Sequence, residues 1–307
     1  MTTKGARISA AAGPPAVFPG VPATVAAAGL RQWPHAGAAG ASDAWWSTIR
    51  GSGPIIATAI HDGGGLRAEA LALMKLATHD RLREEDPHTG ELIVAVPTRV
   101  IAHRSRFEVD LNRARAEAVY RTPAQAWGLE VWKEPPDEAF VERSLVLHDA
   151  FYGMMQGLLD GIVRENGRFV LLDVHSYNHR RDGPGGAATD PAKAPDINLG
   201  TFSMPRGRWT PVLDALADSV RAFDYPGRRL SVGIDVAFQG RGALARFVHE
   251  TYPETGCAVA LEVKKFFMDE WTGVPHRDHI AALQRMFAAL LPALQAGLDA
   301  SPRAQGA

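Results

Sequence analysis

Short apolar segments alternate with longer amphipathic segments along most of the chain. The short segments are rich in β-branched residues and are bounded by Gly, Pro or charged positions, which is typical of buried strands. They predict strands over residues 54–60, 92–97, 168–174, 229–234 and 257–263.

The longer segments have the apolar periodicity of helices, with spacings of three and four in residues 138–165. They predict helices over residues 66–82, 138–165, 210–223, 241–252 and 277–298. Strands that alternate with helices favour an α/β fold, with a mixed, mostly parallel sheet sandwiched between helices. Sheets of this kind bind ligands at the carboxyl ends of their strands.

The two ends of the chain differ in composition from its middle. Residues 1–35 are rich in Ala, Gly and Pro and predict a flexible arm. Prolines between positions 14 and 22 interrupt any apolar stretch of the length that a secretory signal needs. Residues 301–307 predict a disordered tail. A single folded domain is therefore expected over residues 36–300, and a cytoplasmic location is the default.

Composition narrows the classes of function. With 46% hydrophobic and 22% charged residues, the chain can bury a large core, and it has no apolar run of the roughly 18 residues that a membrane span needs. The formal net charge is -1, so no overall field attracts nucleic acid or an anionic membrane. The single cysteine, Cys257, excludes an intramolecular disulfide and a cysteine-based zinc site. Any bound metal is expected to be held by His and carboxylate groups.

Two histidines lie at the ends of predicted strands, where a ligand site is expected. His61 is followed by Asp62 and three glycines, and His175 comes two residues after Asp173. A single His in such a place is usually a hydrogen-bonded loop residue, but two of them favour a metal site. Asp173 is expected to orient an imidazole or to cap the strand. The acidic segment 84–86 offers a carboxylate ligand, although it is also typical of a solvated turn.

Charged residues concentrate in two further places. Residues 103–113 carry several arginines around Asp110 and Asn112, and the guanidinium fork pairs well with carboxylates. A surface segment with ordinary ion pairs is the alternative. Glu262 lies in an apolar strand, where an unpaired carboxylate is costly, so it is a better functional candidate than its exposed neighbours.

Taken in order along the chain, these motifs resemble the N-formylglutamate amidohydrolase family. The matching segments are His61 to Gly64, Asp86-Pro87, Ser105-Arg106, residues 109–113, Asp173 to Ser176, residues 196–201 and Glu262 to Lys265. The resemblance covers roughly residues 54–273. It implies a fold similar to that of the zinc carboxypeptidases and a metal-dependent amide hydrolase.

The resemblance also implies a metal site with one zinc ion. His61 and His175 look like the histidine ligands, and Asp86 looks like the carboxylate ligand. Zinc carboxypeptidases take His and Glu from one His-x-x-Glu turn, but the fourth position here is Gly64. The carboxylate must therefore come from elsewhere, and Glu85 is the alternative to Asp86.

Further roles follow from the same resemblance. Glu262 looks like the general base, and Arg106 resembles the arginine expected near the scissile carbonyl. Asn112 and Arg113 look like the pair that grips a substrate carboxylate. Tyr177 is expected to line the pocket.

The implied activity is the release of formate from N-formyl-L-glutamate, or from a related N-acyl amino acid, by metal-activated water. A peptidase or amidase acting on a larger acylated metabolite is the second hypothesis. A non-catalytic carboxylate-binding protein on the same fold is the third, and the presence of both histidines, the acidic segment and Glu262 argues against it. We expect a small-molecule substrate and neither nucleic acid nor membrane as a partner.

Overall fold

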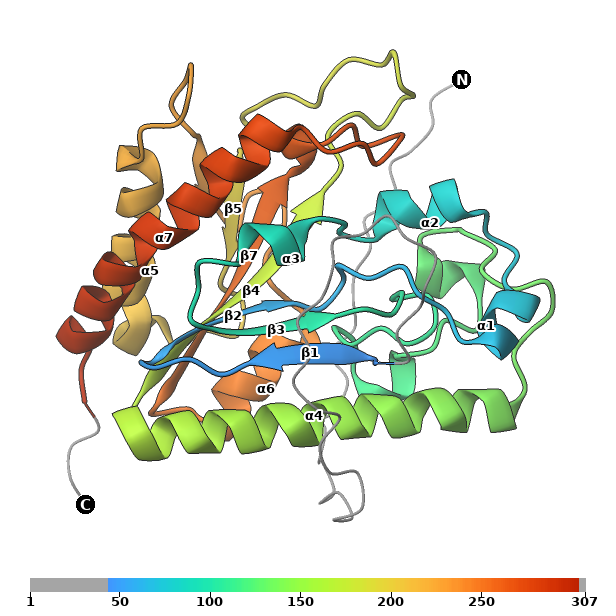
Figure 1. The fold of residues 1–307 in the computed structure, drawn as a ribbon, viewed down its shortest axis with the longest axis horizontal. Coiled ribbons are helices and arrows are strands. Elements are labelled where there is room, and N and C mark those ends of the chain that lie inside the picture. The colour runs from blue at the N-terminus through green and yellow to red at the C-terminus, as the bar shows by residue number, and fades with distance from the viewer. Residues whose placement is uncertain (1–43, 304–307) are drawn as a thin grey trace.

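A seven-stranded sheet runs through the middle of the structure, with strand order β1-β3-β2-β4-β7-β5-β6 (Figure 1). The computed structural model describes residues 44–303. The strands are β1 (Trp46–Ile49), β2 (Ile55–Ala59), β3 (Thr98–Ala102), β4 (Phe169–Tyr177), β5 (Ile197–Gly200), β6 (Val232–Ile234) and β7 (Gly256–Lys264). Strands β3, β2, β4 and β7 are parallel, whereas β1 and β5 run antiparallel to β3 and β7. The prediction of a mixed, mostly parallel sheet is confirmed.

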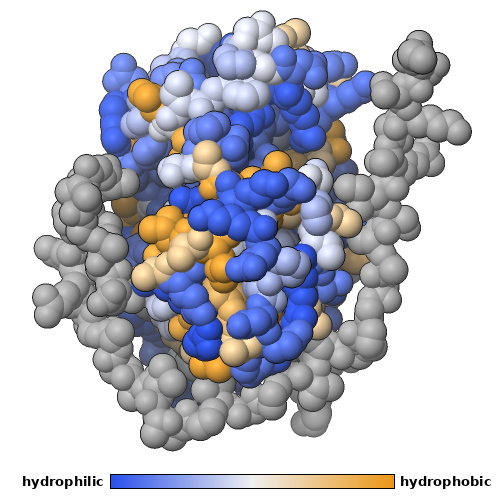
Figure 2. Space-filling view, turned by 90° about the vertical axis from the view of Figure 1, so that its right-hand side faces the viewer, coloured by the Kyte–Doolittle hydropathy of each residue, from blue (hydrophilic) through white to orange (hydrophobic). Residues whose placement is uncertain are grey.

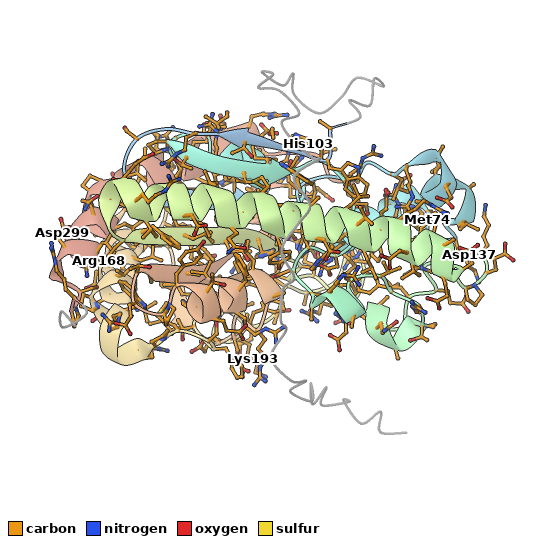
Figure 3. All side chains as sticks on the ribbon, turned by 90° about the horizontal axis from the view of Figure 1, so that it is seen from below. Met74, His103, Asp137, Arg168, Lys193 and Asp299 are labelled. Carbon is orange, nitrogen blue, oxygen red and sulfur yellow. The ribbon has the colours of Figure 1, made fainter. Side chains whose placement is uncertain are left out.

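Helices cover both faces of this sheet. They are α1 (Ala68–Leu73), α2 (Thr78–Glu84), α3 (Thr89–Leu92), α4 (Glu138–Asn166), α5 (Arg206–Ala222), α6 (Ala243–Thr251) and α7 (Arg277–Ala300). Side chains of α3, α5 and α7 pack on one face, and those of α4 and α6 pack on the other. Figure 3 shows α4 lying lengthwise along its face, with Asp137 before its first turn and Arg168 just beyond its other end.

The pattern of side chains along β4 explains where a polar site can form. On the face of α5 and α7, the strand is apolar until its last residue on that face, Ser176: the earlier ones are Val170, Leu172 and Val174. On the face of α4, the strand begins with apolar residues and ends with polar ones: Phe169, Leu171, Asp173, His175 and Tyr177. Because alternate residues of a strand share a face, this switch places a polar group beside the carboxyl end of the sheet without opening the opposite core.

Helix α7 is the one helix among residues 44–303 that is long and apolar enough to cross a membrane, with a mean hydropathy of 1.2 over 18 residues. Its apolar side chains, such as Leu283, Phe287 and Leu294, belong to the core that α7 shares with α5 and the sheet. A core helix passes the same test of length and composition, so α7 is weak evidence for a membrane span.

The predicted helix 66–82 is two helices in the structure. Between α1 and α2 the chain pairs with a distant segment, because Met74 and Trp132 form an antiparallel bridge. The amide of Lys75 donates to the carbonyl of Val131 at 2.8 Å. This tertiary pairing takes backbone groups that a continuous helix would need, and periodicity within the segment could not reveal it.

The predicted strand 92–97 is wrong. Residues 89–92 form the short helix α3, and the strand begins after Pro97, as β3. Ile93 and Val96 are nevertheless fully buried in the core beneath α7. A short apolar run can be buried equally well in a strand or in a packed turn. The apolar pattern alone therefore could not distinguish the two. The short strands β1 and β5 were not predicted.

The two predicted terminal segments lie largely outside the described residues. The arm predicted over residues 1–35 falls wholly outside them, as do residues 304–307. At the start of the predicted tail, Ser301 is buried, and its carbonyl accepts a hydrogen bond from Arg168 at 2.8 Å.

A buried histidine connects α6 to the sheet. Strand β5 ends its pairing with β7 at Ala260, so the amide of Ala258 has no partner from β5. The amide donates instead to Nε2 of His249 at 3.0 Å, and Nδ1 of His249 lies 2.8 Å from the Ser203 hydroxyl. Nε2 must therefore be unprotonated, and burial lowers the pKa of His249 to about 4.

We predict that His249 makes the fold sensitive to acid. An unfolded histidine titrates near 6.5 and the folded one near 4, so the stabilisation is complete above about pH 6.5 and is lost as the pH falls toward 4. The parent should lose about 3 kcal/mol more than His249→Gln over this range, measured by denaturant unfolding. His79→Gln, at an exposed position on α2, is the control and should follow the parent. An equal loss in His249→Gln and the parent would contradict the prediction.

Candidate active site

Three buried residues from separate segments meet at the carboxyl end of the sheet. His61 follows β2, His175 lies on β4 and Asp86 follows α2, and their ligand atoms lie within 4.8 Å of one another. Nδ1 of His175 is 3.0 Å from Oδ2 of Asp86, and Nδ1 of His61 is 3.5 Å from the same oxygen. The three side chains that the sequence assigned to a metal are therefore brought together.

Both imidazoles are held by a second carboxylate. Nε2 of His61 lies 2.8 Å from Oδ1 of Asp110, and Nε2 of His175 lies 3.0 Å from Oδ2 of Asp173. The other oxygen of Asp173 accepts a hydrogen bond from Thr58 of β2 at 2.7 Å. In both residues Nε2 faces this second carboxylate and Nδ1 faces the shared centre, which is the usual arrangement of metal-binding histidines. Nδ1 of His61 has no hydrogen-bond partner among residues 44–303, although it is buried.

The backbone and neighbouring side chains hold Asp86 in place. Its amide donates to the carbonyl of His61 at 2.8 Å, and its Oδ1 accepts from the Ser176 hydroxyl at 3.1 Å. The buried ammonium of Lys265 donates to the carbonyl of Glu85 at 2.8 Å. Burial opposes ionisation of Asp86, but the neighbouring imidazoles of His175 and His61 keep the pKa of this carboxyl well below its usual range. Asp86 is therefore an anion poised between two imidazoles.

A glycine turn lets the chain after His61 approach β3 closely. A Cβ atom on Gly63 would lie 2.1 Å from the carbonyl carbon of His103, so only glycine fits there. The amide of Gly65 donates to the carbonyl of His103 at 3.1 Å. Asp62 accepts a hydrogen bond from the amide of Gly90 at 2.9 Å, which ties the turn to α3. These contacts fix the position of His61 relative to the segment that carries Asp86.

Glu85 points to different partners. Its Oε1 accepts from Arg81 at 3.2 Å and from the Ser105 hydroxyl. It is not part of the cluster of ligand atoms, which contains Asp86 instead. The geometry therefore places Asp86, and not the alternative Glu85, against the two histidines.

Glu262 lies directly beside this cluster. It is the register partner of His175 on β4 and of Asn198 on β5, so the three side chains lie in a row on the α4 and α6 face. Glu262 is half-buried, and within residues 44–303 its carboxylate makes no hydrogen bond or ion pair. Its neighbour Lys264 pairs with Asp196 at 2.9 Å instead. Burial raises the pKa of Glu262 to about 7.

Arg106 is joined to the cluster through Asp110. Its guanidinium donates to Oδ2 of Asp110 at 2.8 Å and to the Tyr120 hydroxyl at 3.3 Å, and it lies 4.8 Å from the ring of Trp127. Because Oδ1 of the same carboxylate holds His61, one aspartate fixes both an imidazole and a cation. Sequence reasoning did not single out Asp110, although its place in the Asp-x-Asn-Arg motif was the available signal.

Asn112 and Arg113 lie on the same side as Arg106. Nδ2 of Asn112 is 3.3 Å from Nε2 of His175, and the Asn112 carbonyl accepts the first amide of α6 at 2.9 Å. Arg113 donates to the carbonyl of Gln125 at 2.9 Å and lies 4.9 Å over the Tyr120 ring. The side chain of Arg113 is 26% exposed, so it remains open to a ligand.

Tyr177 continues the face that carries His175. Its hydroxyl donates to the carbonyl of Pro195, and its ring meets the ring of Phe238 edge-on at 5.4 Å between centroids. The hydroxyl is thus used within the chain, and the ring is the part of Tyr177 that can face a substrate. The sequence placed Asn198 in the motif of residues 196–201 without a role, and it did not identify Phe238, because nothing local connects the loop after β6 to β4.

Comparisons with known proteins bear on both fold and family. A family model described as N-formylglutamate amidohydrolase matches residues 53–268. The crystal structure of N-formylglutamate amidohydrolase from Ralstonia eutropha JMP134 is similar, with a TM-score of 0.62 and 16% identity over 82% of this chain and 96% of that chain. A gene product from Agrobacterium tumefaciens gives a TM-score of 0.59 and 15% identity over 82% and 95%.

A weaker likeness links the fold to a metallo-carboxypeptidase from Pseudomonas aeruginosa. Its TM-score is 0.33 at 13% identity, covering 83% of this chain and 60% of that chain, which is too low to carry an argument. No curated protein matches the sequence.

The cluster predicts which residues retain a metal. Asp86→Ala and His61→Ala should abolish zinc retention, because two remaining ligands make a loose site. Asp173→Asn should weaken zinc binding by about 10- to 100-fold, since it removes the carboxylate charge beside His175 and leaves only one acceptor oxygen for Thr58 and His175. Metal analysis and competition with a chromophoric chelator measure both effects. Glu85→Gln is the matched control and should keep parental affinity. Loss of zinc from Glu85→Gln but not from Asp86→Ala would reverse the assignment.

Proposed function

This chain belongs to the N-formylglutamate amidohydrolase family, and we propose that it is a zinc-dependent hydrolase of N-formyl-L-glutamate or a related N-acyl amino acid. The observation that carries the proposal is the placement of an unpartnered carboxylate, Glu262, beside a buried cluster of His61, Asp86 and His175. Family membership supports an amidohydrolase, and the cluster supports the choice of metal chemistry.

The donor set fits one zinc ion. Two imidazole nitrogens and one carboxylate oxygen are the ligands of many catalytic zinc sites, which leave a further position for water or substrate. Each imidazole of the set is backed by a carboxylate, Asp110 for His61 and Asp173 for His175. Zinc held by these residues would polarise the amide carbonyl and lower the pKa of a water molecule toward about 7.

Glu262 would move the protons in this reaction. Within the described part of the chain its carboxylate makes no hydrogen bond or ion pair, so none has to break before it accepts a proton. Burial raises its pKa to about 7. It would accept a proton from the attacking water and deliver that proton to the departing nitrogen, because an amine is a poor leaving group until it is protonated. Arg106, held by Asp110, would stabilise the charge that develops on the carbonyl oxygen.

Arg113 and Asn112 would bind the carboxylate of the amino acid. The partly exposed guanidinium of Arg113 keeps donors in addition to the one that reaches Gln125, and a carboxylate pairs with such a group by charge-assisted hydrogen bonds. Substrate would therefore lie with its carboxylate toward the segment after β3 and its amide over the cluster.

Two other functions remain to be separated by experiment. A peptidase or amidase would act on a larger acylated metabolite, and a binding protein would use the arginines without turnover. Zinc-loaded protein should release formate or another acid from a panel of N-formyl and N-acyl amino acids. Absence of turnover on the whole panel would favour the binding protein. A cytoplasmic location and the lack of nucleic-acid and membrane partners stay predictions.

Replacing the proposed base should separate chemistry from binding. Glu262→Gln keeps the size of the side chain but removes a strong proton acceptor, so kcat should fall by about 10²- to 10⁴-fold. Zinc content and substrate affinity, measured directly, should change little. Asp269→Asn is the control, because Asp269 is exposed and caps the turn at residues 271–272. Loss of zinc from Glu262→Gln would indicate that Glu262 is a metal ligand. Near-normal turnover would show that Glu262 is not the base.

Arg113→Ala tests which part of the substrate the arginine holds. A lost charge-assisted hydrogen bond costs about 1.5–3 kcal/mol, so kcat/KM on free N-acyl amino acids should fall by about 10- to 100-fold. Amidated derivatives of the same substrates should lose far less. Arg115→Ala provides the control, because Arg115 pairs with Asp149 on α4. Equal losses on acids and amides would make Arg113 a structural residue.

A further inference from the structure

The loop after β6 is fixed against the site by one buried side chain. Asn198, the neighbour of Glu262 on β5, is fully buried. Its Nδ2 donates to the carbonyl of Phe238 at 2.7 Å, and its Oδ1 accepts the amides of Val236 at 3.0 Å and Ala237 at 2.9 Å. Three hydrogen bonds from a residue adjacent to the proposed base therefore determine where this loop lies.

A second set of contacts makes the same loop rigid. Asp235 has a left-handed backbone with φ of 56°, and its carboxylate accepts both the amide of Thr201 at 2.8 Å and the Thr201 hydroxyl at 2.7 Å. Further along, the backbones of Gly200 and Gly240 touch so closely that a Cβ atom on Gly200 would lie 2.5 Å from Cα of Gly240. The loop is thus held at both ends and in the middle.

This rigid loop presents apolar side chains outward beside the site. Val236 is 48% exposed and Phe238 is 38% exposed, and the Phe238 ring meets Tyr177, which follows His175 on the same face of β4. Exposed apolar groups alone mark no site, since apolar patches also appear on the otherwise hydrophilic end of the molecule in Figure 2. Here, however, the apolar groups lie on a fixed backbone close to Glu262 and His175. Ligand sites commonly combine apolar side chains with a few polar groups in this way.

Charge is distributed unevenly around the proposed centre. Arg106 and Arg113 come from the segment after β3, and Arg106 reaches the cluster through Asp110, next to the histidine that follows β2. The loop after β6 lies beyond β7, on the side of β5. The arginines and the apolar wall therefore come from different segments, which meet where the Asn112 carbonyl accepts the first amide of α6.

We propose that Val236, Phe238 and Tyr177 form a specificity wall for an apolar part of the substrate. The inference rests on the proposed function and narrows it: the preferred substrate carries an apolar group that N-formylglutamate lacks. That group is either the side chain of the amino acid or an acyl chain longer than formyl, because the two share the same chemistry.

Cations near the wall are the groups that could bind a second carboxylate of the substrate instead. Lys264, the register partner of Tyr177, pairs with Asp196 at 2.9 Å, and Arg206 pairs with Asp235 at 3.0 Å. Arg241 is occupied, since it bonds to Gln239 at 2.7 Å and stacks 4.0 Å over the ring of Phe202. Arg181 is exposed on the segment after β4, and its charge acts on Tyr177. If the substrate has a second carboxylate after all, Arg181 is the residue that would receive it.

The test compares kcat/KM values of the zinc-loaded full chain on five substrates. N-formylglycine is the reference, N-formyl-L-leucine and N-formyl-L-phenylalanine test an apolar side chain, N-hexanoylglycine tests an apolar acyl group, and N-formyl-L-glutamate tests a second carboxylate. We expect at least one apolar substrate to exceed the reference by about tenfold, the scale of burying an apolar side chain. N-formyl-L-glutamate should not exceed the reference.

Variants connect the preference to the wall. Phe238→Ala should lower the ratio of the preferred apolar substrate to N-formylglycine by about tenfold, and Val236→Lys should also raise the relative rate on N-formyl-L-glutamate. Val146→Lys is the matched control, because Val146 lies on α4 with a similar exposure of 52% and should leave every ratio unchanged. Thermal unfolding of each variant verifies that it is folded.

The outcomes separate this inference from the proposed function. A preference for N-formyl-L-glutamate that disappears in Arg181→Ala overturns the inference and leaves the hydrolase intact. Ratios in Val236→Lys and Phe238→Ala that match those of Val146→Lys overturn it as well. Absence of turnover on all five substrates overturns the proposed function, and the inference with it.

Discussion

The charge of Asp86 between two buried imidazoles is the constraint on which the rest of the site depends. A buried carboxylate is stable only when it is paired and hydrogen-bonded, and Asp86 meets this condition through His61, His175 and Ser176. Each imidazole in turn needs an acceptor for its second nitrogen. Asp173 supplies one, and its other oxygen accepts from Thr58, its register partner on β2. The polar network therefore forms only when β4 and β2 pair in this register.

That network also explains features of the chain that lie outside it. Oδ1 of Asp110 accepts from His61, and its Oδ2 accepts from Arg106 and Tyr120, so the long segment after β3 has to fold back over the strand ends. The glycine turn after His61 lets this segment approach closely, since a side chain at Gly63 would collide with the backbone after β3. The glycine turn and the path of the segment after β3 are thus consistent with the positions that the buried charges require.

The sequence predicts those parts of the molecule that depend on local pattern. Their places at the ends of predicted strands identified His61 and His175, and the sheet type followed from the alternation of segments. The break between α1 and α2 and the loop held by Asn198 depend on partners more than thirty residues away, so no local period contains them. For the same reason Asp110 was seen in its motif, but its position between an imidazole and a guanidinium was not.

Glu262 differs from the fully buried acids of this region in having no partner within the described part of the chain. Asp86, Asp110 and Asp173 are each bonded on both oxygens or to more than one partner, whereas Glu262 has no hydrogen bond or ion pair among residues 44–303. Glu262 is only half-buried, but burial still raises its pKa to about 7, and no partner among these residues offsets the cost of its charge. The position of this unpaired carboxylate beside His175 therefore supports the proposed role of Glu262 as a proton acceptor.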